Sequence, residues 1–209
     1  IYFFNNSQKS YLINNVLLKN DIDFDLDFYK SKVDNSSNDI LRFFPSISLT
    51  ASYPQVKLKK RKSILIEPIT QFIYTRDDNK TAKIRNEDSL ETELVSSNLF
   101  TKNKYYGDDR KEHGFRINYG FKIKLNNTNG MSESFMFGRS YHEKKQEQFD
   151  AYSRYKGKYS DFVGNYTLYF SKDSKLYYDF RTSDDLDLNR NRLKTDFKIY
   201  DSKININYI

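Results

Sequence analysis

The sequence predicts an all-β fold built from antiparallel, up-and-down strands, and three observations indicate it. Apolar and polar residues alternate with a period of two in several segments, and no segment combines helical periodicity with helix caps. Polar clusters rich in Asp, Asn and Ser separate these segments. Mean hydropathy is -0.84 although 17% of the residues are aromatic, which is typical of strands that show lipid on one face and water on the other.

The alternation is first clear in residues 21–28, where four aspartates alternate with four apolar residues. On a strand these aspartates line one wetted side, whereas on a helix they would spread around the cylinder. A calcium loop of the EF-hand type needs Gly at its sixth position and Glu at its twelfth. The chain has Leu26 and Lys32 there. The strand interpretation is therefore preferred.

The same pattern returns along the chain. Residues 115–125 alternate throughout and have the length of a tilted membrane strand. Further alternating segments are residues 47–53, 162–170, 193–199 and 204–208, and turn clusters lie at 34–39, 76–79, 126–130, 172–174 and 201–202. We therefore expect roughly nine or ten transmembrane strands joined as hairpins.

Two stretches do not alternate. Residues 86–106 are mostly polar, and we expect a short strand at 89–95 followed by a long loop. Residues 141–157 are heavily charged and are interpreted as a strand end that runs into an extended loop or a protruding hairpin. Nothing in the sequence indicates a second domain, so residues 1–209 are expected to form one barrel domain.

The charge pattern is basic but dispersed. The chain has 35 basic and 28 acidic residues, a net charge of +7 and a pI of about 9.2. Such a balance suits nucleic acid, anionic lipid or a phosphorylated glycolipid. The one tight basic run, residues 57–62, is more typical of a solvated turn than of a phosphate site.

The residues of most enzyme and metal sites are missing from the sequence. It contains no cysteine and two histidines, which excludes thiolate chemistry and is too few for a typical zinc site. It has no nucleophile elbow, P-loop or dinucleotide motif. No apolar run approaches the ~20 residues of a membrane helix. We expect no enzyme, no cofactor and no bound metal.

Basic and aromatic residues interleave at 102–106 and 152–159. This arrangement can bind single-stranded nucleic acid by stacking and phosphate contacts. In a barrel the same residues form the aromatic girdle and the lumen wall. Because aromatic residues follow strand alternation elsewhere, we prefer the barrel and expect no nucleic-acid partner.

Residues 66–141 carry a series of short motifs in a fixed order. The series is Glu67-Pro68, Asn86-Glu87-Asp88-Ser89, Asn98-Leu99-Phe100, Gly107-Asp108-Asp109-Arg110, the segment 114–120, and Gly138-Arg139-Ser140-Tyr141. In order and spacing it resembles the barrel of the LptD family, with Arg139 in place of the family's usual Gln. The resemblance is close over residues 42–141 and architectural elsewhere.

The resemblance implies a function in lipopolysaccharide assembly in the Gram-negative outer membrane. The family forms a barrel of about two dozen strands behind a periplasmic domain. A plug lipoprotein, LptE, occupies the lumen. Lipopolysaccharide arrives over a periplasmic bridge of the LptA type and leaves through a seam between the first and last strands. This chain resembles central strands alone, so we expect an incomplete segment of the barrel in contact with outer-membrane lipid.

The motif residues have two interpretations. In the structural one they satisfy one another in a folded loop, Asp109 and Arg110 through charge-assisted bonds. In the functional one the loop folds into the lumen and shapes the transport path or contacts the plug. Strand parity separately places Arg116, Lys122 and Lys124 on the lumen face, where they are expected to attract lipopolysaccharide phosphates.

Two other fold hypotheses remain open. A small complete barrel, acting as a porin or an adhesin, requires the first and last strands to pair. A soluble β-protein that binds nucleic acid or glycan requires a second sheet over the aromatic face.

Overall fold

The computed structural model describes residues 2–33, 36–76, 80–145, 149, 157–199 and 202–209. It contains one antiparallel sheet of 11 strands and a separate pair of short strands. Its only helices within those ranges are two 3-10 turns, so the all-β prediction is confirmed. None of the helices in the described ranges has the length and apolar character needed to cross a membrane. The large sheet comprises β1 (Tyr2–Ile13), β2 (Val16–Val33), β3 (Ser36–Ser52), β4 (Gln55–Lys59), β5 (Lys62–Thr75), β8 (Gly114–Asn127), β9 (Ser132–His142), β10 (Phe162–Tyr169), β11 (Lys175–Thr182), β12 (Leu188–Ile199) and β13 (Ser202–Tyr208).

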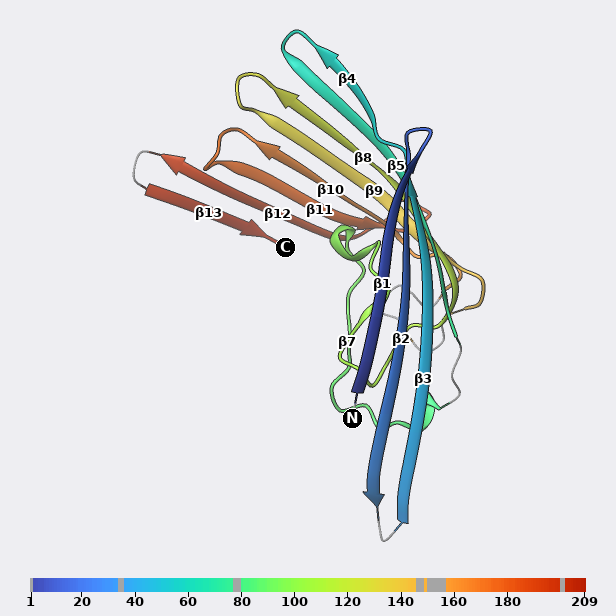
Figure 1. Ribbon diagram of the computed structural model, residues 1–209. Helices are drawn as coiled ribbons and strands as arrows, with labels where there is room; N and C mark the ends of the chain where they lie inside the picture. Colours follow the sequence, from blue (N-terminus) through green and yellow to red (C-terminus); the bar gives the residue numbers. More distant parts are fainter. Residues whose placement is uncertain (1, 34–35, 77–79, 146–148, 150–156, 200–201) are drawn as a thin grey trace.

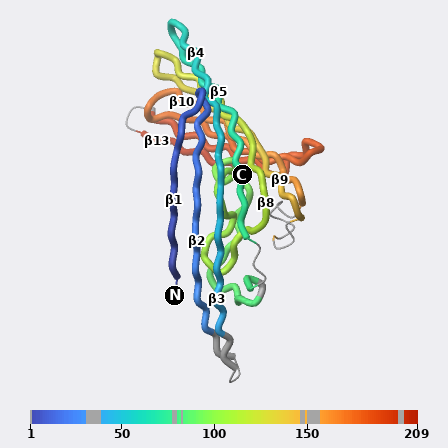
Figure 2. Tube along the Cα trace, turned by 45° about the vertical axis from the view of Figure 1, so that its right-hand side comes forward, coloured from blue at the N-terminus to red at the C-terminus, as the bar shows by residue number. Residues whose placement is uncertain are grey.

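The strands follow the chain in space. Their order is β1-β2-β3-β5-β8-β9-β10-β11-β12-β13, and β4 pairs with β5 beyond the end of β3. This extra hairpin raises the strand count above the nine or ten expected. β1 and β13 lie at opposite ends of the sheet and do not pair. The pairing of first and last strands that a small closed barrel requires is therefore not found. The sheet is strongly bent, and the chain between β5 and β8 lies in the hollow of the bend (Figures 1 and 2).

The register sorts the side chains onto two faces. Phe24, Phe72 and Phe121 share the outer face, and the rings of Phe121, Phe137 and Phe162 follow one another with centroids 6.1 and 5.2 Å apart. Phe24 and Phe72 are 46% and 39% exposed, and no second sheet covers this face in the ranges described. The covered aromatic face that a soluble β-protein requires is therefore not found.

The inner face is polar, and the buried apolar cluster lies on it. Leu94, Leu99, Met136, Phe149 and Val163 form this cluster, between the sheet and the chain that fills the hollow. The strand expected at 89–95 is wrong in extent, because only β6 (Leu90–Glu91) pairs with β7 (Tyr105–Tyr106). The chain turns away after β6, which takes Leu94 into the cluster.

The two ends of the sheet differ. One end carries short turns, among them the two-residue turn Asn14-Asn15, whose positive φ angles of 48° and 66° suit a type I′ hairpin. The other end carries the long connections 76–113 and 143–161. The turn predicted at 34–39 is wrong in extent, because β3 begins at Ser36. Residues 34–35 of that turn, 77–79 of the turn at 76–79, 201 of the turn at 201–202 and most of the charged stretch 141–157 lie outside the described residues.

Candidate functional site

The candidate site is the segment 80–113, called here the inner segment, together with the inner face beneath it. The inner segment contains η1 (Thr81–Lys83), β6, η2 (Ser96–Asn98) and β7. It joins β5 to β8 and lies in the bend of the sheet (Figure 1). There it contacts β2 and β3 on one side of the bend and β9, β10 and β11 on the other. Three of the six motifs lie in it, at positions 86–89, 98–100 and 107–110.

Two aspartates brace the ends of the inner segment against each other. Asp109 accepts hydrogen bonds from the backbone N–H groups of Glu87 (2.8 Å) and Asp88 (3.1 Å), and Asp88 accepts from those of Asp108 and Asp109 (both 3.1 Å). Burial alone would raise the pKa of the Asp88 carboxyl. The hydrogen bonds from the N–H groups of Asp108 and Asp109 have the larger effect, so its pKa is lowered. Gly107 has φ +87°, and a Cβ there would lie 2.5 Å from the Asp88 carbonyl oxygen. The brace therefore requires glycine at 107.

Asn86, Ser89 and Arg110 complete the same brace. Asn86 donates to the Ser89 carbonyl (2.9 Å) and accepts from the Ser89 N–H (3.0 Å), while the Ser89 hydroxyl accepts from the Arg110 N–H (2.8 Å). The Arg110 guanidinium donates to the Thr81 carbonyl at 2.5 Å. Asp109 and Arg110 thus bind different backbone groups and not each other. The Glu87 side chain is 74% exposed.

Asn98, Leu99 and Phe100 anchor the middle of the inner segment. Asn98 accepts from the Val95 N–H (3.0 Å) and donates to the Glu93 carbonyl (2.8 Å). Leu99 is fully buried in the apolar cluster and Phe100 packs against it. A Cβ at Gly138 would lie 2.7 Å from the Leu99 side chain, so glycine on β9 makes room for this contact.

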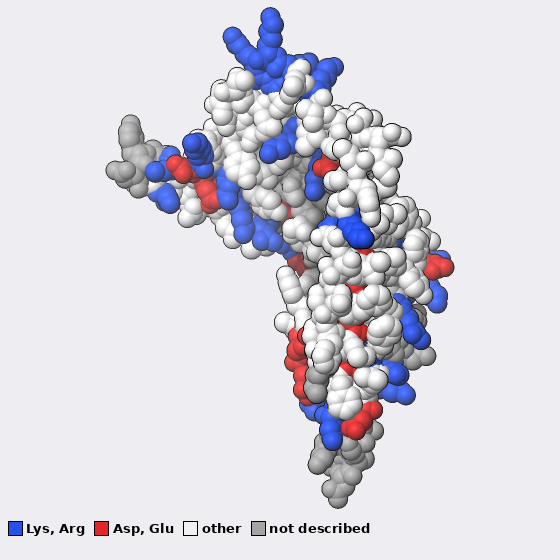
Figure 3. Space-filling model, in the orientation of Figure 1, with Lys and Arg blue, Asp and Glu red and all other residues white. Residues whose placement is uncertain are grey.

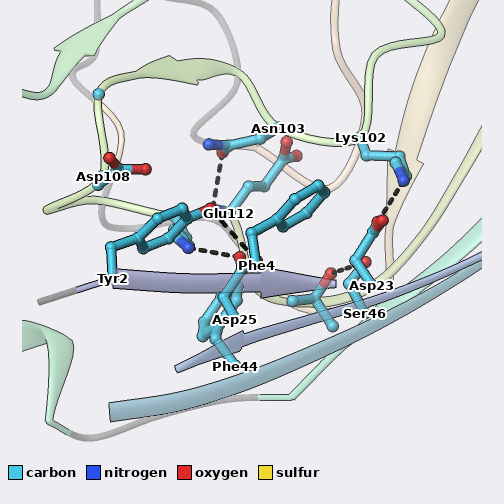
Figure 4. Close-up of a pocket in the computed structure, with 13 residues that line it drawn as sticks. Tyr2, Phe4, Asp23, Asp25, Phe44, Ser46, Lys102, Asn103, Asp108 and Glu112 are labelled. Carbon is cyan, nitrogen blue, oxygen red and sulfur yellow. Dashed lines mark hydrogen bonds and ion pairs between the residues drawn. The ribbon is translucent and has the colours of Figure 1, made fainter. Parts of the chain in front are cut away.

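Ion pairs fasten the inner segment to β2. Lys102 binds Asp23, and Lys111 binds Asp25 (Figure 4). The Lys111 ammonium also lies 3.8 Å from the carboxylate of Asp27. Asp21, Asp23 and Asp27 are 7%, 6% and 2% exposed, so the wetted side expected for these aspartates is wrong. The inner segment supplies the counter-charges of Asp23 and Asp25, whereas Asp21 pairs with Lys19 of its own strand at 3.5 Å. A pocket of about 220 Å³ remains between the two lysine–aspartate pairs.

Arg42 of β3 binds β2 and the inner segment next to the Lys111 ion pair. It binds Asp27 at 2.5 Å and donates to the carbonyls of Asp108 and Asp109, the latter at 2.8 Å. Its side chain is fully buried. A buried guanidinium that holds both a strand carboxylate and the brace ties the inner segment to β3.

A second buried ionic cluster lies where the inner segment enters β8. Glu112 lies 3.4 Å from Arg116 and 3.1 Å from His142. Burial opposes the charge of Glu112, but Arg116 and His142 lower its pKa to about 2. Burial lowers the pKa of Lys104 to about 8, against the opposing effect of Glu112. Arg116 faces inward but is 1% exposed, so it holds the inner segment and is closed to a ligand.

The chain matches one protein family almost from end to end. The family is LptD, described as LPS transport system D, and the match covers residues 4–209. The chain belongs to the LptD family. No curated protein matches it. The open antiparallel sheet is accordingly an incomplete segment of an LptD-type barrel, from a family that handles lipopolysaccharide at the outer membrane.

The remaining motif residues lie on the strands of this LptD sheet. Pro68 points to the outer face, and its carbonyl accepts from the Tyr53 N–H (3.1 Å), between the end of β3 and the start of β4. A residue without an N–H fits there, because the ladder is interrupted. Glu67 faces inward opposite Lys122. Lys122 and Lys124 are exposed on the inner face.

Arg139 is the motif residue at which this sequence departs from the resemblance. It points outward, 4.2 Å from the Phe162 ring centroid and 4.8 Å from that of Tyr159. It donates to the Ser160 carbonyl (2.6 Å) and pairs with Asp184 (2.7 Å). These contacts satisfy the charge of an arginine at an outward position.

Sequence reasoning missed a basic group on the inner face of β11 and β12. Lys175, Arg192 and Lys194 line a pocket of about 430 Å³, and Lys175 pairs with Asp196 at 3.3 Å. Arg192 has no ion pair within the described ranges, and its Nε lacks a hydrogen-bond partner. The alternation at 193–199 was the available signal, because its parity puts Arg192 and Lys194 opposite the apolar face.

Proposed function

We propose that this chain forms part of the wall of an outer-membrane barrel that delivers lipopolysaccharide to the outer leaflet. The observation that carries the proposal is one sheet with an apolar, exposed outer face and a charged inner face, in a chain of the LptD family. Outer-membrane lipid would contact the outer face. Residues 1–209 would be one part of the barrel domain.

The inner segment would shape the path on the lumen side. Its motif residues bind backbone groups within the segment, and Leu99 is buried beneath it. These contacts support a positioning role for the residues and leave contact with lipopolysaccharide to the exposed inner face. The family's description as a transport system supports a proposed role in transport without catalysis.

The unpaired cations of the inner face would receive the phosphates of lipopolysaccharide. Lys122, Lys124, Arg192 and Lys194 carry positive charge there and form no ion pair within the described ranges. Arginine and lysine are the side chains that bind phosphate oxygens by charge-assisted hydrogen bonds. Arg116 is not among them, because the inner segment covers it.

Membership of the family supports two proposed protein partners. A plug lipoprotein of the LptE type would occupy the hollow beside the inner segment, and an LptA-type bridge would supply lipopolysaccharide from the periplasm. The exposed polar surface of the hollow supports a water-filled lumen that such a plug would fill.

A crosslinking pair tests the proposal. Leu193 and Lys194 are neighbours on β12 that point to opposite faces. A photoreactive residue at 194 is expected to capture lipopolysaccharide in cells, and one at 193 to capture phospholipid instead. Equal capture of lipopolysaccharide at both positions, or none at 194, would contradict the proposal.

A further inference from the structure

The basic run at 57–62 forms the tip of the β4–β5 hairpin, called here the basic hairpin (residues 55–66). This hairpin projects beyond the end of β3, at the end of the sheet that carries the short turns. Figure 3 shows lysine and arginine side chains gathered at this tip. The five cations are Lys57, Lys59, Lys60, Arg61 and Lys62, and all are exposed.

The charge of the basic hairpin is not compensated. Residues 55–66 include no aspartate or glutamate. None of the five cations forms an ion pair with a residue that the structure describes. The neighbouring turns are different: Asn14-Asn15 is neutral, and residues 171–174 contain one lysine and one aspartate. The positive charge is therefore specific to this hairpin.

The register places three of these cations on the lipid side. Lys57 pairs with Ile64, which pairs in turn with Leu125, the last apolar residue of the outer face of β8. Lys59 pairs with Lys62 one step further out, so Lys57, Lys59 and Lys62 point outward where the apolar face ends. Lysine stems can lie along apolar surface while their ammonium groups reach the headgroups.

We infer that the basic hairpin binds anionic phospholipid headgroups of the leaflet at the short-turn end. Outer-membrane barrels place short turns on the periplasmic side, so the ligand is an anionic lipid of the periplasmic leaflet. Lysines near an anionic bilayer surface contribute attraction that salt screens. The inference rests on the proposed membrane location and assigns this surface a role apart from lipopolysaccharide transport.

Tryptophan quenching in vesicles tests the inference. The chain contains no tryptophan, so Gln55→Trp introduces one reporter on the outward side of β4. The full chain is reconstituted in phosphatidylcholine vesicles with phosphatidylglycerol, and either lipid is brominated in turn. We expect the anionic lipid at the reporter to exceed its bulk share about fivefold, as ~1 kcal/mol of attraction gives, and the excess to fall in high salt.

Matched charge removals identify the cause. Lys57→Gln, Lys59→Gln and Lys62→Gln together are expected to return the anionic lipid to its bulk share. Lys83→Gln, Lys145→Gln and Lys158→Gln remove the same charge from exposed positions at the opposite end and are expected to keep the excess. No excess in the parent, survival of the excess in the first variant, or its equal loss in both would overturn the inference.

A second reporter separates this inference from the proposed function. Phe121→Trp lies on the outer face of β8 and is expected to be quenched by either brominated lipid at its bulk share. If that reporter is quenched and Gln55→Trp shows no excess, only the headgroup site fails. If neither lipid quenches Phe121→Trp, the membrane location fails and the headgroup site with it.

Discussion

At the scale of single residues, the inner segment is held by side chains that serve its backbone. Asp88 and Asp109 each accept backbone N–H groups from the opposite end of the segment, and Asn86 and Asn98 do the same locally. Of the two interpretations of the motif residues, these contacts favour the structural one. The resemblance identified their positions, but no pattern in the sequence states that residues 20 apart bond to each other's backbone.

Gly107→Ala is expected to undock the inner segment. The positive φ alone costs about 1 kcal/mol for a residue with a side chain, and the close Asp88 carbonyl adds a clash. Gly130→Ala is the matched control, because Gly130 has φ +86° with nothing within 4 Å of an added Cβ. Thermal unfolding in vesicles should show the larger loss for Gly107→Ala, and equal losses would contradict the clash.

Asp109→Ala with Arg110→Ala is expected to impair barrel assembly. The change leaves the N–H groups of Glu87 and Asp88 without their acceptor, and each lost, partly buried hydrogen bond costs about 0.5–1.5 kcal/mol. Glu87→Ala removes an exposed carboxylate nearby and should assemble normally. The amount of folded protein in the membrane measures this. Normal assembly with lost lipopolysaccharide export would instead indicate a direct transport role.

At the scale of elements, the alternation predicted the strands of the sheet but not the covering of its aspartates. Alternation with a period of two predicts which residues lie on the same face of a strand. It does not state what covers that face, because Lys102 and Lys111 lie in a segment without periodicity. The reduced strand at 90–91 has the same origin: the need to bury Leu94 and Leu99 decides the path there, and that need is tertiary.

Lys111→Ala is expected to release the inner segment from β2. The change removes the lysine that pairs with Asp25 and Asp27, and both aspartates stay largely buried. Breaking such a buried pair costs about 3–5 kcal/mol. Adding Asp25→Asn to the same variant should recover part of the loss. Limited proteolysis within residues 86–110 measures release. Unchanged protection in Lys111→Ala would show that Arg42 and Lys102 hold this end without Lys111.

The Glu112 cluster predicts loss of docking in acid. The pKa of Glu112 is about 2 in the folded protein and 4.5 in the unfolded chain, so the unfolded chain takes up the proton first as pH falls. The stabilisation, about 3 kcal/mol, is present above pH 4.5 and is lost as pH falls from there towards 2. Hydrogen exchange of residues 104–112 should show this step, and Glu112→Gln should lack it.

At the scale of the whole molecule, the sheet is defined by the difference between its faces. Composition and alternation were sufficient to predict strands with one apolar face, because each outer face is apolar along the strand, but only the resemblance to central strands of the LptD family implied an open sheet. The position of the inner segment in the bend depends on contacts with β2, which is distant in the sequence and gives no local signal of them.

Phe121→Lys is expected to destabilise the sheet in a bilayer by about 2–4 kcal/mol, since it places a charge on the lipid side. Ser134→Lys puts the same charge on the inner face of the adjacent strand. It lies opposite Lys124, which costs less than ~1 kcal/mol. Denaturant unfolding in vesicles measures both. Equal losses would show that the two faces meet the same solvent.

The pairing of Lys102 with Asp23 and of Lys111 with Asp25 also sets an order of events during folding. These partners are 79 and 86 residues apart in the chain. Closing loops of that length is slow compared with forming a hairpin between neighbouring strands. The hairpins therefore form first, and the hollow is still empty while β5 and β8 pair. Pulse-labelling should find the amides of residues 86–110 protected last, so that closure of this segment reports a completed sheet.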